Sequence, residues 1–304
     1  CKNKKKKGTI CFVSFFIYDN IKKKEKKMKF KIVADASCDI PEELRKKYDV
    51  SIIPIEVAFG EELYPEGLDA RTFYNKMAST GLIPKTAMPN TYKFEQFYKD
   101  YCNKDDVFVI TIVISMELSQ TKVQAQMAAE NLGMKNVFIE ESTVTTAAQG
   151  ALIIELCKFI EKCQDIEKIK EEFYRLRDKI KLFAIINDLK YLKNSGRLSS
   201  TSAVIGSMLN VKPIVSIVDG KVVNIAKCMG TPKAEAYLLS SLANIDTTRP
   251  LWFLHTDNLP AIERFEEKNK AKFEAIPEKV VCEIGCVVGS HVGAKCYGVT
   301  FFEK

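Results

Sequence analysis

Short apolar runs alternate with longer periodic segments along the chain, which predicts strands that alternate with helices. The run Val107–Ile114 is almost wholly apolar, as is typical of a strand covered on both faces. Residues 93–101 and 166–180 instead gather their apolar side chains on one helical face. Strands are expected at residues 30–34, 50–57, 107–114, 136–139, 183–186, 213–218, 221–226, 251–254 and 280–288.

Local signals predict two more helices. One spans residues 120–131, directly after a strand. The other is expected to begin after Asp39, because Pro41 and Glu42 follow it with the spacing of a capping box.

The order of these elements predicts an α/β protein with two α/β domains. Strand–helix alternation up to residue 180 favours a mainly parallel sheet flanked by helices. After that point, Asp219-Gly220 between two apolar runs is a hairpin signal, so the second sheet is expected to be mixed. We expect domains at residues 29–180 and 181–304, since 304 residues exceed one typical domain.

The net charge of +7 is concentrated at the start of the sequence. Residues 1–31 hold 12 lysines against Asp19 and Glu25, which leaves 34 basic and 37 acidic residues in the rest. A mildly acidic body argues against a nucleic-acid-binding domain. Residues 1–28 are interpreted as a basic extension, disordered or artefactual, with Met28 as the natural start. Contact with acidic polymers or anionic lipid is the alternative.

The chain is expected to be a soluble cytoplasmic protein. No segment reaches the roughly 20 apolar residues that span a bilayer, and Thr9–Tyr18 lacks the small residues of a signal-peptide cleavage site. The ten cysteines are scattered and include no C-x-x-C pair. We therefore expect reduced, mainly buried thiols and no metal site.

Signatures of the common enzyme classes are missing from the sequence. It has no phosphate-binding loop, no dinucleotide-binding glycine motif, no G-x-S-x-G and no H-E-x-x-H. The sequence therefore indicates no catalytic residue, no cofactor and no autonomous enzyme.

The first candidate binding site lies where the strand 107–114 leads into a helix. Ser115 and Ser119 place two hydroxyl groups beside a helix N-terminus, where free N–H groups and the helix dipole favour an anion. Ligands of open parallel sheets bind at this end of the strands. The alternative is that Ser119 only caps its helix.

His291 and Arg197 are the other candidates. His291 is expected in a turn after an apolar strand, where Gly289 and Gly293 let the backbone approach a ligand. A structural histidine is the alternative. Arg197 precedes a serine-rich cap for a helix that reaches Asn210. Its guanidinium suits either an acid headgroup or a salt bridge between the domains.

Five segments form a combined signature. They are Asp35-Ala-Ser-Cys-Asp39-Ile-Pro41, Pro84-Lys-Thr86-Ala-Met-Pro89, Ile114-Ser115 through Leu118-Ser119 and Thr121, Leu189 through Gly196-Arg197, and Ile284-Gly285 through Gly289-Ser-His291-Val-Gly293. Together and in this order they resemble the DegV family, fatty-acid-binding proteins that serve bacterial fatty-acid kinase. The resemblance runs from about Lys29 to the C-terminus.

The resemblance implies that one long-chain fatty acid lies between two α/β domains, with its acyl chain in an apolar tunnel. Its carboxylate would bind Thr86, Ser115, Ser119 and His291, with Arg197 near the headgroup or at the domain interface. It also implies a non-catalytic protein that presents the acid to a separate kinase, which converts the carboxylate to an acyl phosphate.

Five positions depart from the usual family pattern. Ala87 and Met88 replace a serine and a glutamine, Met116 and Gln120 replace a serine and a glycine, and Met229 stands where a basic residue is common. The resemblance thus implies fewer hydroxyl groups around the carboxylate and altered kinase docking. The alternatives are an enzyme or binder for a small hydroxylated or phosphorylated ligand, related to dihydroxyacetone-kinase folds, and a purely structural module.

Overall fold

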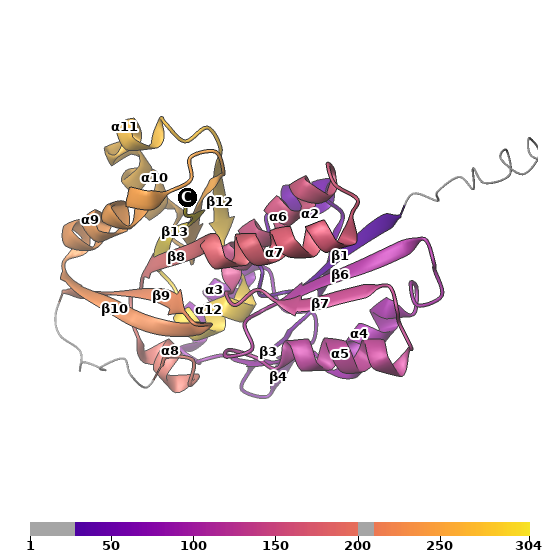
Figure 1. Cartoon of the computed structure of the whole chain (residues 1–304). Coiled ribbons are helices and arrows are strands. Elements are labelled where there is room, and N and C mark those ends of the chain that lie inside the picture. The colour runs from indigo at the N-terminus through magenta and orange to yellow at the C-terminus, as the bar shows by residue number, and fades with distance from the viewer. Residues whose placement is uncertain (1–27, 200–209) are drawn as a thin grey trace, which may run out of the picture.

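The computed structural model describes residues 28–199 and 210–304 (Figure 1). The first of its two large sheets is entirely parallel. The first sheet consists of β1 (Lys29–Asp35), β2 (Val50–Ile53), β6 (Val107–Val113) and β7 (Val137–Glu141). Its order is β2-β1-β6-β7, and every neighbouring pair is parallel. This confirms the parallel sheet expected before residue 180.

Helices cover both faces of the first sheet. As a result, every residue of its inner strand β6 is buried. The helices of this part of the chain are α2 (Glu42–Lys47), α3 (Ala70–Thr80), α4 (Thr91–Tyr98), α5 (Thr121–Asn131), α6 (Thr146–Ile160) and α7 (Ile166–Lys179), of which α3 packs in a separate apolar cluster. Val109 and Val113 pack in one apolar cluster with α4 and α5, whereas Ile110 and Ile112 pack in another with α6. The two faces of the strand thus alternate, as the pleat requires.

The second large sheet is mixed, as expected. Its strands are β8 (Ile180–Ile185), β9 (Val211–Val218), β10 (Lys221–Met229), β11 (Leu251–His255), β12 (Lys279–Glu283) and β13 (Tyr297–Phe302), in the order β10-β9-β8-β13-β11-β12. Only β11 and β12 pair in parallel. The hairpin predicted at Asp219-Gly220 joins β9 to β10. The remaining helices are α8 (Lys190–Asn194), α9 (Thr231–Ser241), the 3₁₀ turn η1 (Leu242–Asn244), α10 (Leu259–Lys268), α11 (Lys270–Phe273) and α12 (Cys286–Val292).

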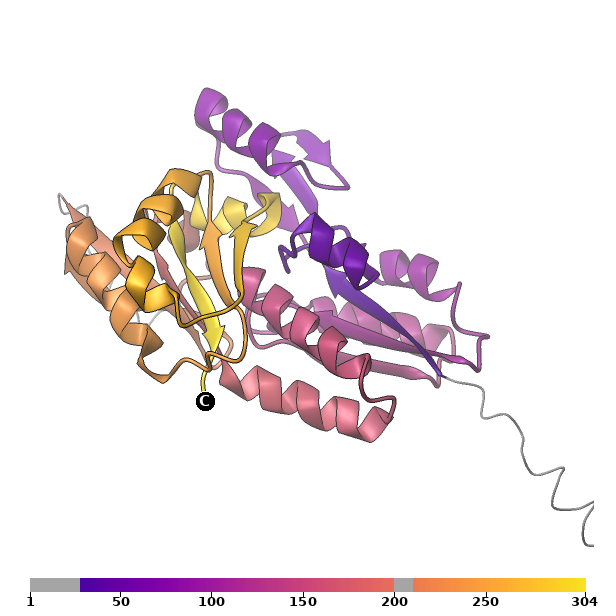
Figure 2. The same ribbon diagram turned by 90° about the horizontal axis from the view of Figure 1, so that it is seen from above.

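Helix α6 lies between the two large sheets (Figure 2). All of its residues except Lys158 and Phe159 are buried. One hydrophobic cluster joins the helix to Ile112 of the first sheet and to Trp252 of the second. Gly150 permits this packing, because a Cβ atom there would lie 2.6 Å from the carbonyl oxygen of Cys38. The sequence pattern had not identified this helix.

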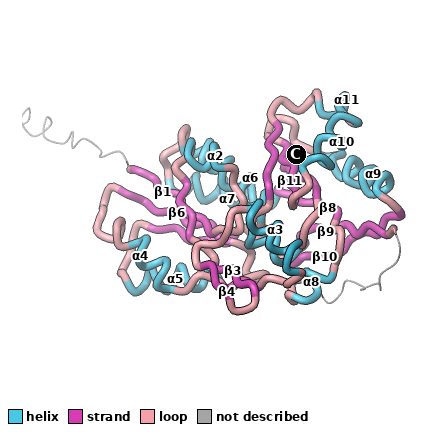
Figure 3. The backbone as a smooth tube through the Cα atoms, turned by 180° about the vertical axis from the view of Figure 1, so that it is seen from behind, coloured by secondary structure: helices cyan, strands magenta, loops and turns pink. Residues whose placement is uncertain are grey.

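The single strand expected at residues 50–57 is two strands in different sheets. Pro54 separates β2 from β3 (Glu56–Phe59), and proline provides no N–H for a continuous ladder. β3 pairs with β4 (Glu62–Tyr64) and β5 (Lys85–Ala87) in a small antiparallel sheet. Seen from behind, this sheet and α3 cover the junction between the two large sheets (Figure 3).

The strand expected at residues 280–288 is also shorter than predicted. β12 ends at Glu283, and Cys286–Val292 form α12. The capping box expected at Asp39 is absent too, because α2 follows Pro41 without any side-chain cap. The basic extension before Met28 and the helix expected across residues 200–209 lie outside the described residues. None of the described helices combines the length and apolar character needed to cross a membrane.

Candidate functional site

A cavity of about 440 Å³ lies where the sheets meet. Its interior wall is apolar and buried, and comes from five separate segments: Ile55, Ile114, Leu192, Val222, Val287 and Val288. Its mouth is lined by exposed residues, which are Met88, Glu117, Gln120, Gly196 and Arg197. The volume falls within the range of small-molecule sites, and the lining suits a ligand with a long apolar part and a polar end.

Thr86 and His291 meet in the wall of this cavity. Thr86 lies on the edge strand β5, and His291 lies on the last turn of α12. The Thr86 Oγ1 and His291 Nε2 atoms are 2.9 Å apart, and the imidazole tautomer decides which of them donates. The other ring nitrogen, Nδ1, is buried without a hydrogen-bond partner in the described part of the chain. This pair therefore offers an unused polar group to a ligand.

The imidazole of His291 is neutral at physiological pH. Burial, together with the positive charge of Arg197, lowers the pKa of His291 to about 4. A neutral ring has one N–H donor and one acceptor nitrogen. His291 can therefore form one further hydrogen bond through Nδ1, without a positive charge of its own.

The glycines around His291 serve packing within the protein. His291 lies in a helix, not in the glycine-flanked turn expected from the sequence. A Cβ atom at Gly289 would lie 2.6 Å from the Tyr74 hydroxyl oxygen of α3. One at Gly293, where φ is +75°, would lie 2.5 Å from the Tyr191 ring of α8. These glycines let α3 and α8 pack closely against α12.

The two candidate serines occupy different positions. Ser119 lines the cavity, and its hydroxyl lies 2.8 Å from the Thr121 hydroxyl. Helix α5 has Gln120 as its N-cap without a side-chain bond, so Ser119 does not cap it. Ser115 is fully buried, does not line the cavity, and donates a hydrogen bond of 2.9 Å to the Gly220 carbonyl. Ser115 thus connects the end of β6 to the β9–β10 hairpin.

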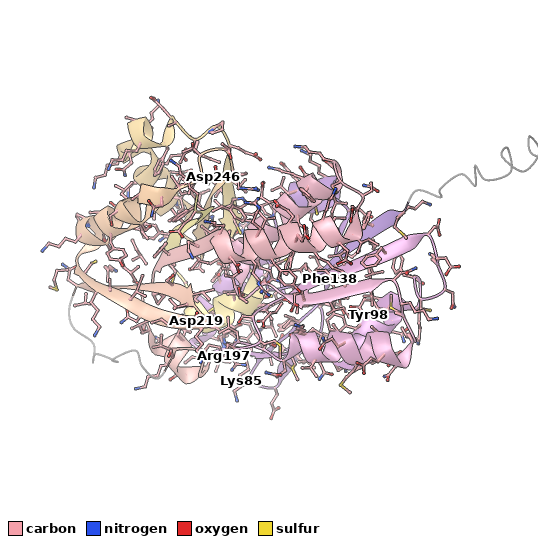
Figure 4. All side chains as sticks on the ribbon, viewed as in Figure 1. Lys85, Tyr98, Phe138, Arg197, Asp219 and Asp246 are labelled. Carbon is pink, nitrogen blue, oxygen red and sulfur yellow. The ribbon has the colours of Figure 1, made fainter. Side chains whose placement is uncertain are left out.

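Arg197 lies in the loop after α8, where Figure 4 labels it, and lines the mouth of the cavity. Its guanidinium is exposed and donates to the Ser195 carbonyl. No carboxylate within residues 28–199 and 210–304 forms an ion pair with Arg197. The expected alternative, a salt bridge between domains, is therefore not observed among the residues described.

The crevice between β1 and β6 is filled by a carboxylate of the protein. Open parallel sheets bind ligands at such a point, where the strand order reverses. Here Asp35 accepts hydrogen bonds from the backbone N–H groups of Ser37 at 2.9 Å and Ile114 at 2.7 Å, and from the Ser37 hydroxyl. Burial raises the pKa of Asp35. The cavity, which Ile114 lines, therefore lies beside this crevice.

Comparison with known proteins identifies the family. The model of the DegV family matches residues 29–304. The chain belongs to the DegV family. It is 30% identical to a DegV domain-containing protein of Clostridium acetobutylicum, over 91% of this chain and 99% of that relative.

Two solved DegV structures are similar to this one. One is DegV of Bacillus subtilis, described as a fatty acid binding protein, with a TM-score of 0.81 and 27% identity. The other is a DegV family protein from Thermus thermophilus, described for its fatty acid binding, with a TM-score of 0.82 and 24% identity. Each comparison covers 91% of this chain and 100% of the other.

Proposed function

We propose that this DegV protein binds one long-chain fatty acid in the cavity and presents its carboxyl group to a partner kinase for acyl-phosphate formation. The observation that carries the proposal is an apolar interior that ends at the Thr86–His291 pair. The Bacillus subtilis relative, described as a fatty acid binding protein, supports it. The apolar wall disfavours a small phosphorylated ligand.

The two ends of the acid would contribute differently to affinity. Burial of an acyl chain yields about 0.8 kcal/mol per methylene, so 14 methylenes give roughly 11 kcal/mol before the costs of binding. A carboxylate buried without hydrogen bonds costs several kcal/mol. We assign the carboxyl group to Thr86, Ser119 and His291, with Arg197 at the mouth. The acyl chain thus provides affinity, and the polar residues fix its direction.

The departures from the family pattern bear on the polar end. Met88 and Met116 both line the cavity, so thioethers stand where the family offers polar side chains. Met229, where a basic residue is common, is 53% exposed at the end of β10. We therefore propose a more apolar mouth than is usual for the family and a changed surface for the kinase.

The organisation and location of the protein are part of the same proposal. We place the boundary between the domains at residues 180 and 181, where α7 meets β8. We also propose a cytoplasmic protein without catalytic residues of its own. All eight described cysteines are free thiols, as is common in a reducing compartment.

The direct test is to identify the bound lipid. Mass spectrometry of an organic extract of the purified protein is expected to yield fatty acids of C14–C18. Delipidated protein should then bind a fluorescent fatty acid at micromolar concentration. Delipidated, folded protein that binds no fatty acid would exclude the proposal, and binding of a small sugar phosphate instead would favour the alternative.

Ser119 and Ser115 allow a matched comparison. Ser119→Ala is expected to weaken fatty-acid binding by about 1 kcal/mol or more, because it removes a hydroxyl group from the cavity wall. Ser115→Ala should lower the free energy of unfolding by about 1–3 kcal/mol, because the Gly220 carbonyl loses its donor, and leave affinity nearly unchanged. Titration calorimetry and denaturant unfolding measure the two effects. The reverse pattern would contradict this assignment.

A further inference from the structure

Asp39 connects three segments that are far apart in the sequence. It lies in the loop between β1 and α2. Its Oδ2 atom accepts a 2.7 Å hydrogen bond from the hydroxyl of Thr146, the first residue of α6. Its Oδ1 atom accepts a 2.9 Å hydrogen bond from the N–H of Gly285, the N-cap of α12. One carboxyl group therefore joins the first sheet to the starts of two helices.

The backbone around these bonds is held in an unfavourable conformation. Asp39 has a φ of +44°, and Thr146, which is β-branched, has a φ of +52°. Such conformations persist only where the surrounding contacts fix them. The N–H of Thr146 also donates to the Ser37 carbonyl at 2.7 Å. The bonds to Asp39 thus belong to a rigid arrangement.

Helix α12 connects Gly285 at its start to the wall of the cavity. It contributes Val287, Val288 and His291 to the cavity wall. His291 follows Gly285 by six residues, or about 9 Å along the helix. At the same end of the helix, the Tyr74 hydroxyl donates a 2.8 Å hydrogen bond to the Ile284 carbonyl. A displacement of Gly285 would therefore change the distance between His291 and Thr86.

Resting on the proposed function, we propose that Asp39 is a positioning residue for the carboxyl site. Its ionised carboxylate fixes the start of α12 and thereby holds His291 beside Thr86. Fatty-acid affinity consequently follows the ionisation of Asp39, although Asp39 does not line the cavity.

The surroundings of Asp39 place this ionisation near neutral pH. Burial raises the pKa of Asp39 to about 7, against the hydrogen bonds from Thr146 and Gly285, and the nearby Asp35 carboxyl adds to the rise. The other titratable groups that face Asp39 have raised pKa values and are uncharged at pH 7: the thiols of Cys38, Cys282 and Cys286 and the phenol of Tyr74.

Protonation of Asp39 affects binding and stability in opposite directions. The ionised carboxylate accepts both hydrogen bonds, and charge-assisted bonds are the stronger ones. The protonated form still accepts from the Gly285 N–H through Oδ1, while its own O–H donates to the Thr146 hydroxyl. The bond to Gly285 then loses its charge assistance, which loosens the start of α12. Because the pKa of Asp39 is raised from its ordinary 3.8, the folded state binds the proton more tightly than the unfolded state. The free energy of unfolding therefore falls as pH rises from about 4 to about 7, whereas affinity rises as Asp39 ionises.

Nuclear magnetic resonance of the ligand-free protein tests the coupling without any fatty acid. The Gly285 amide and the His291 ring resonances are expected to shift together between pH 6 and 8. With a pKa of about 4, the His291 ring itself titrates below that range. Asp39→Asn keeps the shape of the side chain and should abolish both shifts. A His291 ring that does not respond while Gly285 titrates would overturn the proposal.

Binding of palmitic acid at pH 6 and pH 8 tests the consequence. Between pH 6 and pH 8, the affinity of the wild type should rise about three- to tenfold more than that of Asp39→Asn. The reason is that only the wild type gains charge-assisted hydrogen bonds as Asp39 ionises. Thr146→Val is the matched control, because Thr146 bonds the other oxygen of Asp39 and its loss leaves the bond to Gly285 in place. It should keep the response and raise its midpoint, since the hydrogen bond from Thr146 lowers the pKa of Asp39.

The two proposals fail in different ways. Identical pH profiles for wild type and Asp39→Asn would overturn the role of Asp39 while fatty-acid binding stands. A wild-type protein that binds no fatty acid at either pH would overturn the proposed function, and the resonances of Gly285 and His291 would still decide whether Asp39 positions α12.

Discussion

Replacing His291 with alanine is expected to weaken fatty-acid binding by about 1.5–3 kcal/mol, or roughly 10- to 150-fold. The variant loses the side chain that pairs with Thr86 in the cavity wall. A carboxylate then faces a site with one donor fewer, while the apolar wall is unchanged. Titration with delipidated protein measures the loss. His291→Gln, which retains an amide group near Thr86, should recover part of the affinity.

The second histidine provides the control for this variant. His255 is buried at the end of β11 and accepts a 3.3 Å hydrogen bond from the Asn258 N–H, away from the cavity lining. His255→Ala should lower the free energy of unfolding and leave fatty-acid affinity within a factor of about two. Substitutions at residues that are distant from a site and share no partner with it usually act independently of that site. Equal losses of affinity in both variants would show a general effect of destabilisation and remove His291 from the site.

Replacing Gly298 with alanine is expected to destabilise the second sheet severely. Gly298 lies in the central strand β13, between Ala184 of β8 and Leu254 of β11. A Cβ atom at this position would lie 2.1 Å from the Phe183 carbonyl oxygen and 2.6 Å from the Ala184 Cα atom. Both neighbours are backbone atoms of a paired strand and have no room to move. We expect a loss of about 4 kcal/mol or more, beyond the usual range for one substitution.

Gly81→Ala is the matched control for this prediction. Gly81 has a φ of +66° but no atom within 4 Å of the position of its Cβ. The substitution should therefore cost about 1 kcal/mol, from backbone strain alone. Denaturant unfolding distinguishes the two glycines. A Gly298→Ala protein as stable as Gly81→Ala would contradict the strand order of the second sheet.

Local patterns predicted several elements whose surroundings leave a clear periodicity, although α10, which also has one buried face, was not among them. β6 is apolar because helices cover both faces, and α7 has one apolar stripe because only one of its faces is buried. α6 was missed because a helix buried on every side shows no stripe. β13 was missed because Gly298 interrupts its apolar run, and Cys286–Val292 because a short apolar run is compatible with either a strand or a helix.

The candidate site was predictable in part for a similar reason. Ser119 stood out because a helix start after a parallel strand favours an anion, and His291 because flanking glycines let the backbone approach a ligand. Thr86 came only from the resemblance to the DegV family, since a three-residue edge strand has no pattern of its own. The apolar wall was not predictable, because Leu192, Val222 and Val288 look like ordinary core residues until the topology brings them together.

A crystal structure of the delipidated protein soaked with palmitic acid tests the central claim most directly. The account predicts electron density for the acyl chain along Ile114, Leu192 and Val288, with the carboxyl oxygens within about 3.2 Å of Thr86, Ser119 or His291. An acid bound in another part of the molecule, or a carboxyl group at the opposite end of the cavity from His291, would contradict it.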